Sequence, residues 1–183
     1  MPSDQKVAVV TGSSSGIGYE TALTLARNGF LTYATMRNLA KSDNIKSVTN
    51  KEKLPIRINQ LDITDDGSVN NAIRTIVSEA GRIDVLVNNA GYGLVGAFED
   101  LSIQEIKDLY ETNVFGVVRV TQAVLPTMRR QQSGIIVNLS SGAGIFGYPG
   151  DSSYVSTKFA VEGLSESIAY ELEPFGIKFV IIE

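Results

Sequence analysis

Residues 7–26 read VAVVTGSSSGIGYETALTLA, which places a β-branched strand before a glycine-rich turn and an apolar helical run. Glycine at positions 12, 16 and 18 permits a tight turn in which the backbone can approach a phosphate, and the helix N-terminus that follows offers free N–H donors. The turn therefore predicts an anion-binding site, whose candidate residues are Gly12, Ser13, Ser14, Gly16, Ile17 and Gly18. Its GxxxGxG spacing differs from the general GxGxxG dinucleotide pattern, and an ordinary strand-to-helix turn is the alternative.

Further β-branched runs follow this unit, and helical stretches separate them. The predicted strands are residues 6–10, 31–35, 56–60, 84–87, 134–139 and 177–182, and the predicted helices are residues 16–28, 65–80, 102–131 and 152–173, with a weaker one near 39–49. Gly116 and Pro126 fall inside the long third helix, and a change of pattern near Asn113 predicts two helices or a kink there. Alternating strands and helices predict an α/β fold with a doubly wound parallel sheet, the Rossmann fold, covered on both faces and with strand order 3-2-1-4-5-6.

The chain contains 183 residues, of which 43% are hydrophobic and 20% are charged, and it contains no cysteine and no histidine. This composition predicts one soluble globular domain spanning residues 1–183. The missing residue types exclude the Ser-His-Asp triad, cysteine nucleophiles and zinc sites built on thiolates or imidazoles, so no metal is expected. Proton chemistry in this chain must use Tyr, Lys, Asp or Glu side chains.

The net charge is −4, from 16 basic and 20 acidic residues. A nucleic-acid-binding surface needs a concentrated basic face, so no nucleic-acid partner is expected. The N-terminal MPSDQK runs directly into VAVVTG and resembles no targeting leader, and no run approaches the ~18 apolar residues of a membrane span. We therefore expect a cytoplasmic protein without a membrane span.

The second predicted strand lacks the terminal acidic residue that usually bonds the ribose 2′-hydroxyl of NAD. The strand runs LTYAT into Met36 and Arg37, and no Asp or Glu occurs between Glu20 and Asp43. Arg37 can pair bidentately with a 2′-phosphate, which no nearby carboxylate would repel. This pattern favours NADP(H) over NAD as the cofactor, and an ordinary surface arginine is the alternative.

Tyr154 and Lys158 are four residues apart at the start of the last long helix, and Ser141 lies thirteen residues before Tyr154, beyond the fifth predicted strand. Helical spacing puts the tyrosine and the lysine on one face, where the ammonium would stabilise the phenolate form of Tyr154. The tyrosine could then donate and accept a proton near neutral pH, with the Ser141 hydroxyl bonding the substrate oxygen. Taken alone, a Tyr-x-x-x-Lys spacing is common in helices, where the tyrosine simply packs.

With these motifs together, the chain resembles the short-chain dehydrogenases/reductases over essentially all 183 residues. The matching pieces are TGSSSGIG at 11–18, Asp62 in LDIT, NNAG at 88–91, Asn113 in ETNVFG, Ser141 in NLSSGAG, and YVSTK at 154–158. The resemblance implies that Gly12, Gly16 and Gly18 hold the pyrophosphate, Asp62 and Ile63 border the adenine, and Asn88, Ala90 and Gly91 line the cofactor and brace the sheet. It also implies a catalytic set of Asn113, Ser141, Tyr154 and Lys158.

Each catalytic role has a physical reason. Hydride transfer to a carbonyl builds negative charge on oxygen, which a serine hydroxyl and a tyrosine proton donor would stabilise. Lys158 would hold the nicotinamide ribose as well as support Tyr154, and Asn113 could fix a water that connects Lys158 to solvent. The alternative for Asn113 is a bond to its own helix backbone, and for the NNAG segment it is a turn held by asparagine side chains.

These observations predict an NADP(H)-dependent oxidoreductase that interconverts a carbonyl and a secondary alcohol, and the resemblance favours the branch with steroid 17β- and retinol-type dehydrogenases. An apolar stretch after Ser141 agrees with a lipophilic substrate or equally with loop packing.

A broad apolar surface on the last helix, and the family's common helix interface, predict a homodimer or homotetramer. The family continues beyond the sixth strand, so the resemblance implies that a C-terminal substrate-covering segment is missing. The alternatives are a non-catalytic nucleotide-binding module and, with less support from the glycine spacing, a nucleotide-sugar epimerase or dehydratase.

Overall fold

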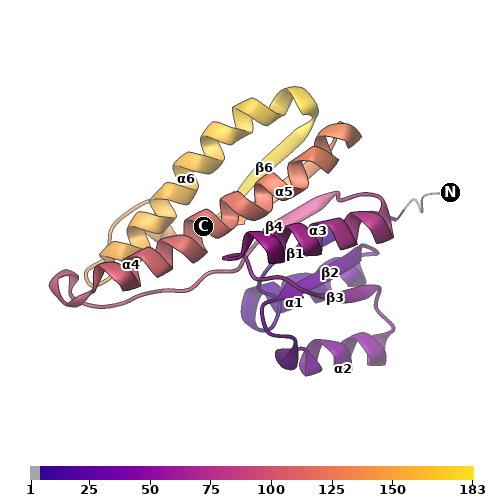
Figure 1. Cartoon of the computed structure of the whole chain (residues 1–183), viewed down its shortest axis with the longest axis horizontal. Helices are drawn as coiled ribbons and strands as arrows, with labels where there is room; N and C mark the ends of the chain where they lie inside the picture. The colour runs from indigo at the N-terminus through magenta and orange to yellow at the C-terminus, as the bar shows by residue number, and fades with distance from the viewer. Residues whose placement is uncertain (1–4) are drawn as a thin grey trace.

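Six parallel strands form one sheet in the computed structural model, which describes residues 5–183 (Figure 1). The strands are β1 Val7–Val10, β2 Leu31–Met36, β3 Ile56–Gln60, β4 Val85–Asn88, β5 Gly134–Leu139 and β6 Ile177–Ile182. Their order, β3-β2-β1-β4-β5-β6, confirms the predicted doubly wound Rossmann topology. The first four residues of MPSDQK, where no leader is predicted, lie outside the described residues.

Helices connect the strands in the predicted alternation. They are α1 Gly16–Arg27, α2 Asp43–Glu52, α3 Asp66–Ala80, α4 Ile103–Tyr110, α5 Gly116–Gln131 and α6 Ser152–Leu172, with short 3₁₀ turns η1 Leu39–Lys41, η2 Phe98–Asp100, η4 Gly142–Gly144 and η5 Glu173–Phe175. The helix predicted near residues 39–49 begins later and ends later than expected. The reason is that Asn38 first caps η1 by accepting from the Ala40 backbone N–H, and α2 starts only after that turn.

Apolar side chains from both faces of the sheet build two cores. On one face, Val9, Leu86 and Ile136 belong to a core that α3, α5 and α6 cover. On the other face, Val10 and Ala34 belong to a core closed by α1 and α2. Because consecutive strand residues point to opposite faces, each apolar strand contributes to both cores, which explains the lack of polar alternation in most of these runs.

One part of the sheet departs from this arrangement. Ile135 on β5 and Val180 and Ile182 on β6 are 39%, 43% and 47% exposed. They share the sheet face that α1 and α2 cover elsewhere, and within residues 5–183 no helix packs over them. Sequence reasoning expected both faces to be covered throughout, so its explanation of the apolar pattern does not hold for this part of the sheet.

The long helical region before β5 is interrupted, as the sequence predicts. A π-helical segment at Glu111–Phe115 joins α4 to α5 and contains the buried Asn113. A π turn inserts an extra residue and reorients the side chains around it, and such turns are frequent at functional sites. Pro126 lies inside α5 without ending it. No helix in residues 5–183 combines the length and the apolar character needed to cross a membrane.

Candidate active site

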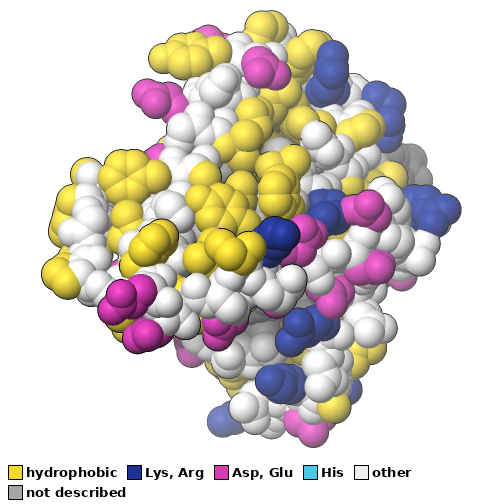
Figure 2. Space-filling view, turned by 60° about the vertical axis from the view of Figure 1, so that its left-hand side comes forward, with side chains coloured by type: hydrophobic (Ala, Val, Ile, Leu, Met, Phe, Trp, Pro, Cys, Tyr) yellow, Lys and Arg dark blue, Asp and Glu magenta, His cyan; other side chains and the backbone are white. Residues whose placement is uncertain are grey.

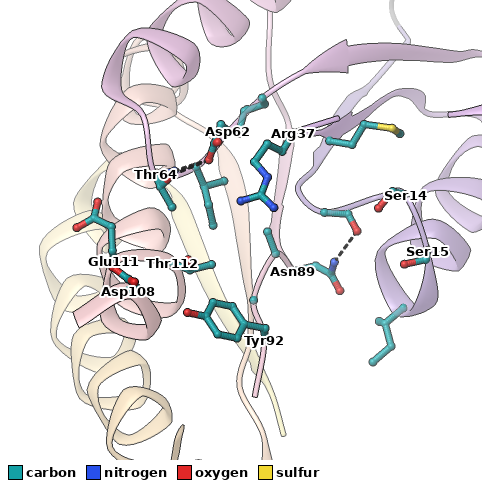
Figure 3. A pocket seen from close by; sticks show the side chains of 17 residues that line it. Ser14, Ser15, Arg37, Asp62, Thr64, Asn89, Tyr92, Asp108, Glu111 and Thr112 are labelled. Atoms are coloured by element: carbon teal, nitrogen blue, oxygen red, sulfur yellow. Dashed lines mark hydrogen bonds between the residues drawn. The ribbon is translucent and has the colours of Figure 1, made fainter. Parts of the chain in front are cut away.

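A cavity of about 930 Å³ opens at the carboxyl ends of β1, β2, β3 and β4, where a doubly wound sheet places its ligands (Figure 3). Eight of the predicted cofactor residues line it: Gly12, Ser14, Ile17, Arg37, Asp62, Ile63, Ala90 and Gly91. These predicted residues come from four separate segments of the sequence, and the fold brings them to one cavity.

The glycine turn presents the start of α1 to this cavity. Ser15, at the N-cap, makes no side-chain cap bond, and the first turn of the helix contains no acidic residue. The first N–H groups of α1 therefore remain available to an anion. Gly12 and Gly16 have φ values of 68° and 60°, which favour glycine at both positions.

Two other predicted turn residues have different surroundings. Ser13 is fully buried, and its hydroxyl donates to the Val10 carbonyl oxygen at 2.9 Å, so this side chain faces the strand. Gly18 is also buried, and a β-carbon added there would lie 2.6 Å from the Gly12 carbonyl oxygen. Ser13 therefore binds the end of β1, and Gly18 packs closely against Gly12 and Asn89. Both residues stabilise the turn, and neither lines the cavity.

Asn89 lines the cavity and holds the glycine turn, a role that sequence reasoning did not assign to it. Its Nδ2 donates to the carbonyl oxygens of Thr11 at 2.9 Å and Gly12 at 3.2 Å, the second of which is drawn in Figure 3. Its neighbour Asn88 is buried and donates instead to Asn138 Oδ1 at 2.8 Å, which braces β4 against β5. Two successive asparagines after a buried strand were the available signal, because alternate residues of a strand face opposite sides.

Arg37 follows β2 and extends its guanidinium toward the cavity, as Figure 3 shows. The nearby Asp62 carboxylate accepts hydrogen bonds from the Thr64 backbone N–H at 3.0 Å and the Thr64 hydroxyl at 2.7 Å. Within residues 5–183, Arg37 forms no ion pair. Its charge is therefore available to a ligand.

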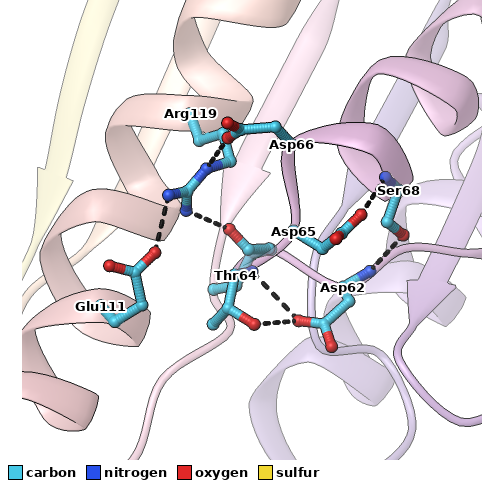
Figure 4. Close-up of polar contacts among 8 residues, drawn as sticks. Asp62, Thr64, Asp65, Asp66, Ser68, Glu111 and Arg119 are labelled. Atoms are coloured by element: carbon cyan, nitrogen blue, oxygen red, sulfur yellow. Dashed lines mark hydrogen bonds and ion pairs between the residues drawn. The ribbon is translucent and has the colours of Figure 1, made fainter.

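Arg119, from α5, fastens the loop after β3 that forms this wall of the cavity (Figure 4). Its guanidinium donates to the Ile63 carbonyl oxygen at 2.7 Å and to Glu111 Oε1 at 2.6 Å, and it also pairs with Asp66. The three contacts join the π segment and α3 to the loop that carries Asp62 and Ile63. This arrangement fixes the wall before any ligand arrives.

The predicted Tyr154 and Lys158 pair lies on the first turns of α6. The Lys158 ammonium donates to the Leu139 carbonyl oxygen at 2.7 Å, at the end of β5, and lies 5.6 Å from the centroid of the Tyr154 ring. Burial lowers the pKa of Lys158, and the negative charge of Glu162 partly opposes this shift. The lysine is therefore a largely buried amine on the same helix face as the tyrosine ring.

Asn113 connects this pair to the loop after β4. Its Oδ1 accepts from the Tyr92 backbone N–H at 3.0 Å, and its Nδ2 donates to the Tyr92 carbonyl oxygen at 2.8 Å and to Thr157 Oγ1 at 3.3 Å. These partners lie outside the helix of Asn113, so the alternative of a bond to its own helix backbone is wrong. The amide positions the loop and α6 relative to each other.

Ser141 stands at the start of η4, where its Oγ accepts from the Ala143 backbone N–H at 3.1 Å. Within the described residues, no hydrogen bond joins Ser141 to Tyr154, and Ser141, Tyr154 and Lys158 lie outside the cavity lining. Tyr92 links the two parts of the site, because it lines the cavity and its main chain binds Asn113. No cluster of three potential metal ligands of the His, Cys, Asp or Glu type occurs in residues 5–183.

Comparisons with known proteins agree with this geometry. A family model described as short chain dehydrogenase matches residues 6–183. The chain is 42% identical over 178 residues to the 3-ketodihydrosphingosine reductase of Bacteroides thetaiotaomicron, covering 97% of this chain and 62% of that protein. It is 41% identical over 183 residues to the human 17-beta-hydroxysteroid dehydrogenase type 1, covering 97% of this chain and 55% of that protein. The chain therefore spans between 55% and 62% of the length of these relatives.

A solved structure shares the fold. The gluconate 5-dehydrogenase of Burkholderia cenocepacia, crystallised with NADP and tartrate, superposes with a TM-score of 0.90 at 28% identity, covering 97% of this chain and 71% of that one.

Proposed function

The chain belongs to the short-chain dehydrogenase family, and from this membership we propose that it is an NADP(H)-dependent oxidoreductase that interconverts a carbonyl and a secondary alcohol. The observation that supports the proposal is a chain of contacts: Asn113 binds Tyr92, which lines the cavity at the sheet's carboxyl edge, and Thr157, which lies between Tyr154 and Lys158 on α6. A proton donor next to a nucleotide site is what hydride transfer to a carbonyl requires.

The residues around the cavity fit a dinucleotide. The free N–H groups of α1 suit a pyrophosphate, and Asp62 with Ile63 forms a wall suited to the adenine. Gly91 and Tyr92 mark the opposite end of the lining, toward Asn113 and α6. When bound, the reduced nicotinamide supplies the hydride that reduces the substrate carbonyl.

The proton steps fall to the side chains of this chain. In the direction of reduction, the Tyr154 hydroxyl donates its proton to the carbonyl oxygen, and the Lys158 ammonium stabilises the phenolate that remains. The Ser141 hydroxyl donates a hydrogen bond to the same oxygen. Asn113 acts on this set by position, because its amide holds Thr157, which lies between the tyrosine and the lysine in the helix. In the direction of oxidation the same groups act in reverse.

An apolar wall beside Ser141 supports a lipophilic substrate. Phe146 and Tyr148 pack together with ring centroids 4.8 Å apart, and the Tyr148 hydroxyl reaches Gly142, the residue after Ser141. Val95, on the facing loop, is 76% exposed, and the two loops join where the Gly96 N–H donates to the Gly150 carbonyl oxygen. Figure 2 shows hydrophobic side chains gathered on one face of the molecule. Two relatives are named 3-ketodihydrosphingosine reductase and 17-beta-hydroxysteroid dehydrogenase type 1, and both names refer to lipophilic compounds.

The test is a panel of carbonyl compounds, long-chain and polycyclic ketones beside small polar ones, assayed by the loss of NADPH absorbance. We expect turnover with NADPH and preference for the apolar ketones. NADPH binding without reduction of any compound would favour the alternative of a nucleotide-binding module, and absence of NADPH binding would contradict both.

Substitution of Arg37 tests the choice of cofactor. In Arg37→Ala we expect the Kd for NADPH to rise about ten- to hundredfold while the Kd for NADH stays the same, because only NADPH has the 2′-phosphate that the guanidinium would bind. Titration of cofactor fluorescence measures both constants. Arg130→Ala, at the far end of α5, is the control. Equal weakening of both cofactors, or a wild type that prefers NADH, would contradict the role of Arg37.

We also propose a homo-oligomer that buries the outer surface of α6. Phe159 on α6 and Phe115 on the adjoining π segment are 47% and 51% exposed, which is high for aromatic side chains on packed helices. Light scattering at micromolar concentration is expected to give the mass of a dimer or tetramer for the wild type. Phe159→Glu should lower that mass, whereas a monomeric wild type would contradict the proposal.

A further inference from the structure

Two buried oxygen atoms, on residues near Lys158, have no hydrogen-bond partner in the described part of the chain. They are Ser140 Oγ, between the end of β5 and the η4 turn, and Glu162 Oε1, on α6. A buried polar atom without a partner costs free energy comparable to that of a lost hydrogen bond, so an orphan in a native protein requires an explanation. Here one orphan is a hydroxyl, which can donate, and the other is a carboxylate oxygen, which can accept.

The two orphans face the same point. A β-carbon added to Gly144 would lie 2.6 Å from Ser140 Oγ and 2.9 Å from Glu162 Oε1. Gly144 is buried in η4, which packs against α6, and its φ is not positive, so backbone strain does not explain the glycine. Glycine instead leaves a space that the Ser140 hydroxyl and the Glu162 carboxylate both border.

This pair lies next to the proposed catalytic lysine. Glu162 comes one helical turn after Lys158, so both side chains lie on the same face of α6. The Lys158 ammonium donates to the carbonyl oxygen of Leu139, the residue before Ser140. Lys158 and Glu162 therefore both reach the segment that leads from β5 into the η4 turn.

Other charges around this part of α6 are already engaged or point away. Glu111, in the π segment, binds Arg119, and Asp108, on α4, accepts from the Gln104 amide. Lys178, on β6, shares its sheet face with Val180, opposite the face that α6 covers. The η4 turn contains no charged residue. Glu162 is the charge that acts on Lys158, and it opposes the lowering of the lysine's pKa by burial.

We propose that Glu162 is a positioning residue for Lys158 and that the Ser140 hydroxyl donates the hydrogen bond that holds the Glu162 carboxylate beside the η4 turn. This inference rests on the proposed role of Lys158 in the reaction. The carboxylate keeps the desolvated lysine protonated under the conditions in which Tyr154 needs a neighbouring cation. The same contact fixes the segment that presents Ser141.

Titration of Lys158 tests the proposal without any need for turnover. The full chain is labelled with ¹³C-lysine, the ¹³Cε resonance of Lys158 is assigned with Lys158→Arg, and its chemical shift is followed against pH. In Glu162→Gln we expect the titration midpoint to fall by about one pH unit. Glu162→Asp keeps the charge and should stay closer to the wild type. Glu166→Gln, one turn further along α6 and exposed, is the matched control and should leave the midpoint unchanged.

Ser140→Ala tests the hydrogen bond. We expect it to lower the Lys158 midpoint by less than Glu162→Gln does, and to add nothing in the double variant, because the hydroxyl acts through the carboxylate. An unchanged midpoint in Glu162→Gln would overturn the proposal, and additive shifts would overturn the role of Ser140. If Glu162→Gln does not fold, an unchanged midpoint in Ser140→Ala overturns the coupling. If the wild-type chain reduces no carbonyl but the Lys158 midpoint still falls in Glu162→Gln, the proposed function fails and this inference stands.

Discussion

Tyr154→Phe is expected to lower the rate constant for carbonyl reduction by about 10²–10⁴-fold, the contribution typical of a positioned general acid. The substitution removes one oxygen atom and leaves the ring, so the contact with Lys158, 5.6 Å from the ring centroid, can persist. A sequence without histidine or cysteine offers few replacement proton donors. Ser141 would remain to bond the carbonyl oxygen, but a serine hydroxyl without a base does not deliver a proton at neutral pH.

The lower reduction rate of Tyr154→Phe should appear in kcat, while the Kd for NADPH stays nearly unchanged. Single-turnover reduction and cofactor fluorescence separate these two quantities. Tyr170→Phe is a matched control on the same helix, because Tyr170 is 73% exposed and distant from the site. If Tyr154→Phe weakened NADPH binding and turnover equally, Tyr154 would be a structural or cofactor-binding residue. Turnover at the wild-type rate would remove the proposed proton donor altogether.

The fold could be predicted from the sequence because its strands are short β-branched runs and its turns contain glycine at positions that need it. Strand order followed from the alternation of strands and helices, which is typical of doubly wound sheets, and the interruption of the long helix was visible in the pattern near Asn113. Helical spacing also placed Tyr154 and Lys158 on one face. In each case the deciding interaction is local, or follows from a general rule of packing.

Contacts between distant segments could not be predicted in this way. The amide of Asn113 binds the main chain of Tyr92, 21 residues earlier, and the amide of Asn89 binds the Gly12 carbonyl oxygen, 77 residues earlier. Such bonds depend on how close two loops approach after the sheet has formed. The same holds for the positions of Ser140 Oγ and Glu162 Oε1, both close to Gly144, which only the assembled η4 turn and α6 bring to one place.

Gly18→Ala is expected to raise the Kd for NADPH about ten- to hundredfold and to lower the melting temperature, because overpacking a tight contact costs about 1–3 kcal/mol. The added β-carbon would lie 2.3 Å from Asn89 Nδ2 and 2.6 Å from the Gly12 carbonyl oxygen. One of these neighbours is backbone, so the turn itself must move. Movement would also disturb the bonds of Asn89 to Thr11 and Gly12, which hold the turn where a pyrophosphate would bind.

The control for this change is Gly163→Ala, on α6. Nothing lies within 4 Å of a β-carbon added at Gly163, and its φ is not positive, so alanine there should leave the melting temperature equal or higher and cofactor binding unchanged. Thermal unfolding and NADPH titration, run on both variants, separate crowding of the turn from a general effect of alanine. If Gly18→Ala bound NADPH as the wild type does while unfolding earlier, the close approach at Gly18 would serve the packing of α1 alone. If Gly18→Ala lost affinity for NADPH at an unchanged melting temperature, the turn would have moved without strain. The changed geometry of the phosphate site alone would then account for the weaker binding.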